Sequence, residues 1–205
     1  MRVLVACEYS GTVRDAFLAL GHDAMSCDLL PTDAPGPHYQ GDVRDVLLDG
    51  WDLMIAHPPC THLAVSGAKW FDKKKSQQEE ALDFVRLLLS APVPRIALEN
   101  PVSIISSRIR KPDQIIQPYE HGHEATKTTC LWLKGLPLLA PSNIVGKGAR
   151  HVTKSGKSLP EWYNLPPSAD RWKLRSATFP GIAKAMAEQW GNAKEWPAQA
   201  DLFTA

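Results

Sequence analysis

The sequence predicts an α/β domain in which a mostly parallel sheet carries helices on both faces, followed by a small irregular C-terminal insertion. Short apolar runs alternate with amphipathic helical patterns through the first hundred residues. This order winds a parallel sheet with right-handed crossovers. The second half is less regular, because ten of the 17 prolines fall from Pro101 onward.

A length of 205 residues is enough for one such domain with a small appendage, and the composition is that of a globular protein. Lys and Arg number 23 against 22 Asp and Glu, which leaves a net charge of +1. This balance gives no polycationic field that would hold nucleic acid generally. Any nucleic-acid contact must therefore be local.

The four cysteines form no CxxC pair, and the N-terminal apolar run is too short for a signal peptide. No stretch approaches the roughly 18 to 20 apolar residues that a membrane-spanning helix needs. We therefore expect a cytoplasmic protein with no membrane association, present as a monomer or weak dimer.

The chain begins with a predicted strand, helix and strand. Residues 2–6 are apolar and β-branched, and residues 12–20 carry apolar side chains at helical spacing. Thr12 is the expected N-cap of this helix and Gly21 its stop. Residues 22–28 then predict a second short strand that ends in an acid.

The proline-rich residues 31–40 are predicted to be a loop, and residues 52–56 a buried strand that ends at two prolines. Ser76 and Glu79 form a capping box for a helix with one apolar stripe. A further strand is predicted over residues 95–98.

The second half contains a predicted strand over residues 128–133 and an amphipathic helix over residues 181–190. Between them, residues 146–157 combine lysine, arginine and glycine in a way that favours a mobile basic loop. The chain thus divides into a catalytic and cofactor-binding core, a basic insertion that we expect to be a minimal substrate-recognition region, and a returning helix, over residues 1–135, 136–175 and 176–196.

Chemically active side chains follow four predicted strands. They are Glu8, Asp28, Cys60 and Glu99. The carboxyl ends of parallel strands share one edge of a sheet, where ligands bind, so we expect these groups to converge. Asp28, about twenty residues after the first turn, is well placed to accept hydrogen bonds from a ribose diol.

The first strand-to-helix turn reads ACEYSG and combines an acid, small residues and Gly11 before a helix. Such a turn allows close backbone approach to a nucleotide-like cofactor. It lacks the G-x-G-x-x-G fingerprint, which argues against a standard NAD site, and an ordinary tight turn is an equal alternative.

Cys60 follows Pro58 and Pro59, and two prolines fix a rigid turn of the kind that a positioned nucleophile requires. A cysteine attacks only as the thiolate. The remaining cysteines lie in or beside apolar runs and are expected to be buried small hydrophobes; they are Cys7, Cys27 and Cys130.

Glu99 precedes Asn100 at the end of a buried strand, where burial would raise its pKa and let it hold a proton, although a cap is the alternative. Two groups could compete as metal sites: His57, Cys60 and His62, and His121, His123 and Cys130. His57 and His62 formally satisfy the H-x₄-H spacing of zinc ligands, but the two prolines between them restrict how both rings could turn inward, and we expect no metal.

In combination, PPC with Ser66 and LENP resemble the nucleophile and Glu-Asn motifs of the cytosine-5 DNA methyltransferases. The short DNA cytosine methylases of phage and bacterial type are the nearest in kind. ACEYSG, Asp28 and GDVRD, which contains Asp42, resemble the family's cofactor contacts. TFPGIAKAMAEQWG resembles its last motif, and the resemblance runs through most of the chain.

The resemblance implies a Rossmann-like fold that binds S-adenosyl-L-methionine and methylates cytosine in DNA, in a bacterium or phage-infected host, as in restriction-modification. Cys60 would add to C6 of a flipped or single-stranded cytosine, and Glu99 would neutralise N3. The implied cofactor contacts are Glu8, Tyr9, Ser10, Gly11, Asp28, Asp42 and Pro58. The implied substrate contacts are Pro59, Ser66, Asn100 and Lys127.

The chain departs from the family in two places. The paired arginines that face the base are replaced by a stretch offering Lys127 and Thr128. No room exists for a large recognition domain, so the basic insertion, with its tryptophans, would contact phosphates and bases. A solvated loop is the alternative to that interpretation.

Three other functions stay open. The chain could methylate C5 of a free cytosine nucleotide, or the amino group of N4-cytosine or N6-adenine in DNA, or it could be a non-catalytic DNA-binding module. The amino-group enzymes carry an acid or Asn before Pro-Pro and an aromatic residue after it, whereas this chain has HPPC.

Overall fold

The computed structural model describes residues 1–65, 75–168 and 171–192. Their main element is a seven-stranded sheet in the order β3-β2-β1-β4-β5-β7-β6. The strands are β1 (Arg2–Ala6), β2 (Asp23–Asp28), β3 (His38–Gln40), β4 (Leu53–Ala56), β5 (Arg95–Asn100), β6 (Gln114–Ile116) and β7 (Thr129–Lys134). The first five are parallel, and β7 runs antiparallel to both of its neighbours. The predicted fold class is confirmed in its architecture: the sheet is mostly parallel and Rossmann-like, with helices on both faces.

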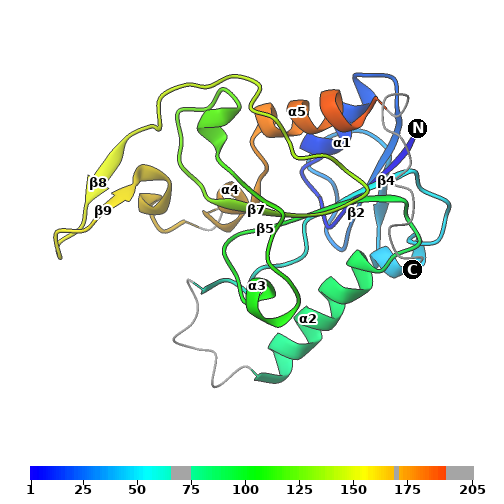
Figure 1. Ribbon diagram of the computed structural model, residues 1–205, viewed down its shortest axis with the longest axis horizontal. Helices are drawn as coiled ribbons and strands as arrows, with labels where there is room; N and C mark the ends of the chain where they lie inside the picture. The colour runs from blue at the N-terminus through cyan, green and yellow to red at the C-terminus, as the bar shows by residue number, and fades with distance from the viewer. Residues whose placement is uncertain (66–74, 169–170, 193–205) are drawn as a thin grey trace, which may run out of the picture.

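Helices cover both faces of the sheet (Figure 1). The α-helices are α1 (Thr12–Leu18), α2 (Lys75–Leu89), α3 (Ile105–Arg108), α4 (Arg171–Ser176) and α5 (Pro180–Trp190). Helices α1 and α5 pack on one face, with Phe17 and Met186 in its core, and α2 packs on the other with Leu82 and Leu88. Single 3₁₀ turns occur at η1 (Val43–Asp45), η3 (Pro118–Glu120) and η4 (Glu161–Asn164).

The central strands are buried on both sides because successive side chains point to opposite faces. In β1, Leu4 and Ala6 pack against α2, whereas Val3 and Val5 pack against α1 and α5. This is why these strands read as continuous apolar runs in the sequence. No helix in the described part of the chain is long and apolar enough to cross a membrane.

Several local predictions are wrong. Residues His38–Gln40 form β3 rather than loop, because they pair in parallel with the end of β2. The N-cap of α1 is Gly11, not Thr12. Ser76 lies inside α2 and donates a hydrogen bond to Glu80, so it does not form the expected capping box with Glu79.

The insertion is also more ordered than expected. Strands β8 (Arg150–Val152) and β9 (Ser158–Pro160) form an antiparallel hairpin. Strand β8 and the turn lie within residues 146–157, the segment predicted to be a mobile loop, and β9 follows directly after it. The hairpin projects from the sheet (Figure 1), and its pairing is reinforced by Arg150, whose guanidinium donates to the side chain and carbonyl of Ser158.

Candidate active site

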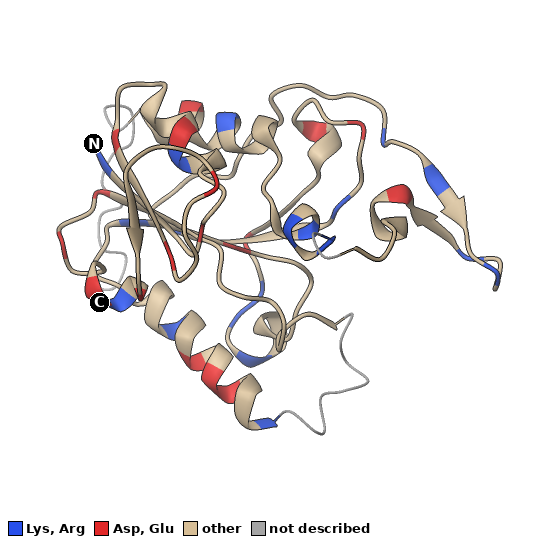
Figure 2. Ribbon diagram, turned by 180° about the vertical axis from the view of Figure 1, so that it is seen from behind, with Lys and Arg blue, Asp and Glu red and all other residues tan. Residues whose placement is uncertain are grey.

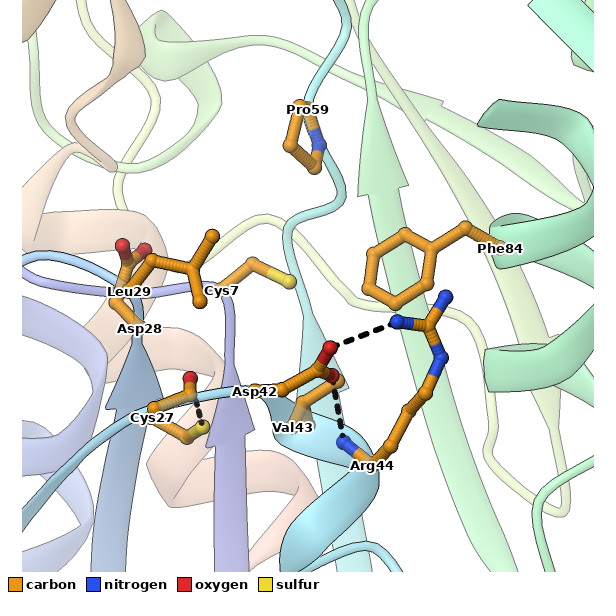
Figure 3. Close-up of a pocket in the computed structure, with 10 residues that line it drawn as sticks. Cys7, Cys27, Asp28, Leu29, Asp42, Val43, Arg44, Pro59 and Phe84 are labelled. Atoms are coloured by element: carbon orange, nitrogen blue, oxygen red, sulfur yellow. Dashed lines mark hydrogen bonds and ion pairs between the residues drawn. The ribbon is translucent and has the colours of Figure 1, made fainter. Parts of the chain in front are cut away.

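A cavity of about 250 Å³ lies at the carboxyl ends of the first parallel strands (Figure 3). Its walls come from the ends of β1, β2 and β3, from η1, from the turn after β4 and from α2. They are formed by Cys7, Cys27, Asp28, Leu29, Gly41, Asp42, Val43, Arg44, Pro59 and Phe84. Asp28 and Leu29 lie across the cavity from Phe84 and Arg44 in Figure 3. The cavity therefore offers apolar and acidic walls in the place where Rossmann-like folds bind nucleotides.

The two predicted acids border this cavity. Asp28 uses Oδ1 to accept a hydrogen bond of 2.9 Å from the backbone of Leu30. Asp42 caps η1, accepting from the backbone and side chain of Arg44 at 3.0 and 2.7 Å. The backbone N–H of Arg44, with its guanidinium, holds the pKa of Asp42 below its ordinary value. Asp42 is thus ionised at neutral pH and contributes a fixed negative charge.

Sequence reasoning missed two aspects of the cavity wall. Phe84 faces the cavity from α2, and nothing in the helical pattern distinguishes it from a core residue. Cys7 is half-buried in a left-handed conformation, with φ of 59°, rather than buried in the core. Cys27 is buried as expected but also borders the cavity, and burial raises its pKa to about 12. Both thiols are therefore protonated at neutral pH.

Glu8 supports the first turn from within. It is buried and accepts backbone hydrogen bonds from Val13 at 2.7 Å and Arg14 at 3.2 Å. Its carboxylate thus satisfies the orphan N–H groups at the start of α1 and complements the positive end of the helix. Gly11 is required beside it, because φ is +76° and an added Cβ would lie 2.4 Å from the Arg14 guanidinium.

Tyr9 of the same turn packs against α4. Its hydroxyl lies 3.2 Å from the Ser176 hydroxyl, and its ring lies 5.7 Å from Trp172. Neither Tyr9 nor Glu8, Ser10 or Gly11 is among the residues that line the cavity. Their cofactor contacts remain predictions.

The turn after β4 joins the cavity to the expected nucleophile. Pro58 is buried, and its carbonyl accepts a hydrogen bond of 2.9 Å from the amide of Asn100. Pro59, the next residue, lines the cavity, and Cys60 follows it in an exposed position. Asn100 therefore holds the turn that presents Cys60. Ser66, the other residue expected near the substrate, lies outside the described residues.

Glu99 meets His57 and Lys127 beside this turn. Its Oε2 lies 3.1 Å from Nδ1 of His57, and both side chains are largely buried, at 16% and 11% exposure. Burial opposes ionisation of Glu99, but the hydrogen bond and charge of His57, together with the charge of Lys127, lower its pKa below the ordinary value. The sequence-based expectation of a raised pKa is wrong, because it could not include these two partners.

The electrostatics of Cys60 depend on the same group. Partial loss of water, and then the negative charge of Glu99, raise the pKa of Cys60, while Lys127 and Arg175 act in the opposite direction. Lys127 donates to the carbonyl of Ala177 at 3.3 Å, and burial lowers its own pKa. Strand ends β4 and β5 and the segment before β7 therefore bring a thiol, a carboxylate and an ammonium into mutual range.

The space beside Glu99 is small. A pocket of about 10 Å³ is lined by Glu99, Lys127, Thr129, Thr178, Phe179 and Ile182. Phe179 also contacts Trp162 and His123, each with a ring distance of 5.1 Å. The volume suffices for a water molecule but not for a base.

The basic side chains of the insertion are carried by the hairpin and its flanks, as the blue segments of the projecting arm in Figure 2 indicate. His151 lies 3.7 Å from Glu161, and Trp162 packs against Phe179 and Lys127. One of the two tryptophans of the insertion, Trp162, is thus held at the candidate site, whereas the other, Trp172, is exposed.

No group of three His, Cys, Asp or Glu side chains within the described residues is arranged to hold a metal ion. The two groups considered from the sequence have other partners. His57 contacts Glu99, His121 lies 3.1 Å from the Ser142 hydroxyl, and His123 accepts a hydrogen bond from the Gly181 backbone.

No protein-family model and no curated protein matches this chain. Among solved structures, the chain is similar to an E. coli protein described as a candidate DNA modification methyltransferase encoded within a prophage. The identity is 15% and the TM-score 0.47, over 72% of this chain and 53% of that chain. This chain therefore matches about half the length of that protein, and a likeness this distant carries no inference about activity.

Proposed function

We propose that this protein is a DNA cytosine-5 methyltransferase that uses S-adenosyl-L-methionine and the Cys60 thiolate. One observation carries the proposal: Pro59 lines a cavity with an acidic wall, and the next residue, Cys60, lies within electrostatic range of Glu99. A nucleoside site and a nucleophile with its acid are thereby joined by a single rigid turn.

The cavity fits the nucleoside part of the cofactor. Asp28 has a second carboxylate oxygen to which no described residue donates, and a ribose diol needs such an acceptor. Leu29, Phe84 and Pro59 supply apolar walls for a flat ring. When bound, S-adenosyl-L-methionine supplies an electrophilic methyl group on a sulfonium.

The chemistry of the chain's own residues follows from cytosine, whose C5 is a poor nucleophile. Addition of the Cys60 thiolate to C6 forms a bond to sulfur and turns C5 into the nucleophilic end of an enamine. Protonation at N3 by Glu99 prevents negative charge from building up on the ring. A water molecule in the site takes the C5 proton as the thiolate is expelled from C6, and the aromatic ring is restored.

The substrate is a cytosine outside its stack, because Glu99 lies beneath the surface and a stacked base would not reach it. Lys127 and Asn100 come from the segments that surround this site, and we assign them to holding the base and the Cys60 turn. The basic insertion, residues 136–175, is assigned to the DNA backbone, because Arg150, Lys154 and Lys157 are exposed on or beside the hairpin.

The test is incubation with labelled S-adenosyl-L-methionine and unmethylated duplex DNA, single-stranded DNA or dCMP, followed by nucleoside mass spectrometry. We expect 5-methylcytosine in DNA that disappears in Cys60→Ser, while Glu79→Gln, an exposed carboxylate on α2, behaves like the wild type. Label in dCMP alone would mean that the substrate is a free nucleotide and not DNA. Amino-group methylation that survives Cys60→Ser would refute the C5 assignment.

DNA containing 5-fluorocytosine gives an independent test of the nucleophile. The fluorinated ring has no C5 proton to lose, so the adduct with Cys60 persists after methyl transfer. We expect a covalent protein–DNA complex that peptide mapping locates at Cys60. Absence of any complex in an enzyme that binds the cofactor would reduce the protein to a binding module.

A further inference from the structure

His57 has no role in the chemistry described so far, yet it makes the closest polar contact to Glu99. Nδ1 of His57 lies 3.1 Å from Oε2 of Glu99, and the two residues sit at the ends of the adjacent parallel strands β4 and β5. An ionised carboxylate only accepts hydrogen bonds, so Nδ1 carries a proton and donates it. The opposite ring nitrogen, Nε2, is buried with no hydrogen-bond partner among the described residues.

We infer that His57 and Glu99 form one proton-holding pair, in which His57 is the positioning residue that fixes Glu99 and keeps a proton available for N3 of the base. This inference rests on the proposed function. The pair can hold its proton in two ways: as an imidazolium beside a carboxylate, or as a neutral imidazole beside a carboxylic acid. Nδ1–H donates to Oε2 in both arrangements.

The unpartnered Nε2 decides between these two arrangements. The imidazolium carries a proton on Nε2, and a buried N–H without an acceptor is costly. Neutral imidazole leaves Nε2 without a proton, so it avoids an unpaired donor. As a base enters the site, the Nε2 proton is lost to the water that the base displaces and Oε1 of Glu99 takes up a proton from that water, so the arrangement with the proton on Oε1 is favoured once water is excluded.

The proton balance is then complete. As the Cys60 sulfur bonds to C6, the Oε1–H bond of Glu99 breaks and an N3–H bond forms. The resulting carboxylate keeps its hydrogen bond from Nδ1 of His57 and its attraction to Lys127. When the thiolate leaves C6, the proton returns from N3 to Oε1, so the pair is unchanged after each cycle.

Ionisable groups on the neighbouring elements also influence the pKa values of the pair. Lys127 approaches from the segment before β7, Cys60 from the turn after β4, and Arg175 from α4. In the open site, His57 and Lys127 hold the pKa of Glu99 below its ordinary value, so Glu99 is ionised at neutral pH before the base enters. The pair, as a unit, retains a proton to higher pH than Glu99 alone.

The discriminating variant is His57→Asn. The side-chain Nδ2 of asparagine lies at the same distance along the side chain as Nδ1 of histidine, so the hydrogen bond to Glu99 is retained while the ionisable ring is lost. We expect the methylation rate of His57→Asn to fall at a more acidic pH than that of the wild type. At pH 7.5 the loss should be roughly 10²-fold, the lower end for general-acid catalysis, and it should shrink toward acid pH.

A second measurement does not depend on activity. In ¹⁵N-histidine protein, the ring signals of His57 are identified by their absence in His57→Asn, and their chemical shifts are compared with those in Glu99→Gln at one pH. The shifts of the wild type should show a proton on Nδ1, and they should change in Glu99→Gln, because the charged acceptor of that proton is removed. Glu79→Gln should leave them unchanged.

The outcomes separate the inference from the proposed function. A pH profile of His57→Asn that parallels the wild type, or ring ¹⁵N shifts of His57 unaffected by Glu99→Gln, would overturn the pair. If the wild type makes no 5-methylcytosine but the ring shifts change as expected, the pair stands and the proposed methylation is wrong.

Discussion

The two halves of the candidate site differ in how much space they provide. The cavity at the ends of β1, β2 and β3 measures about 250 Å³, whereas the pocket beside Glu99 measures about 10 Å³. The first is bounded by strand ends, a 3₁₀ turn and a proline, which have little freedom. The second is lined by the side chains of Lys127 and Phe179, among others, and is too small for a base. Under the proposed function, the cavity is the nucleoside half and is preformed, while the pocket beside Glu99 is the base half and must open when its ligand enters.

The two halves also differ in electrostatics. Near the cavity, Asp42 is held ionised by Arg44 and the cysteines are held as thiols, so the charge is fixed over the neutral range. Near Glu99, the carboxylate, Lys127 and Cys60 shift one another's pKa values. Ligand binding is served by charges that stay fixed with pH, whereas proton transfer needs ionisable groups that shift one another's pKa values. The difference therefore agrees with the two proposed tasks, cofactor binding in the cavity and proton transfer beside Glu99.

The largest expected effect is a loss of methylation that is confined to the base half. Cys60→Ser should lower methylation by roughly 10⁴-fold or more, as loss of a covalent nucleophile does elsewhere. The cofactor dissociation constant, measured by calorimetry, should be unchanged, because the cavity wall next to Cys60 is Pro59. A large loss of cofactor affinity in this variant would contradict the separation of the two halves.

The next effect concerns the frame of the cavity half. Arg14 is fully buried and donates to Ser26, Thr32 and the carbonyls of Ala34 and Pro35, which pins the loop after β2. Arg14→Ala should lower the free energy of unfolding by about 3 to 5 kcal/mol, because its buried partners lose their donor. Urea unfolding measures this.

The matched control for Arg14 is Arg86→Ala. Arg86 is exposed and, among the residues that the structure describes, forms an ion pair with Asp83 alone, so its replacement should change the free energy of unfolding by less than about 1 kcal/mol. Equal effects of the two substitutions would show that Arg14 does not frame the cavity.

Asp28→Asn tests whether the cavity half serves cofactor binding alone. Loss of a charged acceptor for a ribose diol should weaken cofactor binding by about 1.5 to 3 kcal/mol, roughly 10- to 150-fold. The methylation rate at saturating cofactor should stay close to the wild type. Asp23→Asn, at the exposed start of the same strand, serves as the control. An unchanged affinity for Asp28→Asn would remove this residue from the cofactor site.

The smallest expected effect tests the coupling in the base half. The charge of Glu99 contributes to the raised pKa of Cys60, so Glu99→Gln should lower that pKa and increase the thiolate fraction at pH 7.5. Alkylation of Cys60 by iodoacetamide, followed by mass spectrometry, should become several-fold faster. Lys127→Met removes a cation and should slow it.

Cys27 provides the internal reference for alkylation, since burial keeps it protonated in every variant. If the rate at Cys60 is the same in Glu99→Gln, Lys127→Met and the wild type, the thiol and the carboxylate are not coupled, and the base half is not assembled as described.

Much of the sheet could be predicted because it depends on local pattern. The runs of β1 and β4 are buried on both faces, so they are apolar throughout, and the stripe of α2 follows from its single buried face. Placement of Asp28, Cys60 and Glu99 near one edge follows from the rule that parallel strands end together. The two prolines before Cys60 likewise predict a rigid turn, because the proline ring fixes φ.

Other features depend on partners that are distant in the chain, so only the tertiary structure decided them. Residues His38–Gln40 form a strand because the edge of β2 is available to them, not because of their own propensity. Glu8 turned inward to the start of α1, since the unpaired N–H groups there needed an acceptor. The lowered pKa of Glu99 required His57, 42 positions away, to donate a hydrogen bond.

The sequence by itself therefore determined which residue types reach the carboxyl edge of the sheet, because the residue at which each strand ends and the alternation of side chains along it are local properties. The tertiary structure decided which of them touch, how large each pocket is and which carboxylates are ionised. Those properties depend on distances between segments and on the exclusion of water, and neither is encoded in any single stretch of the chain.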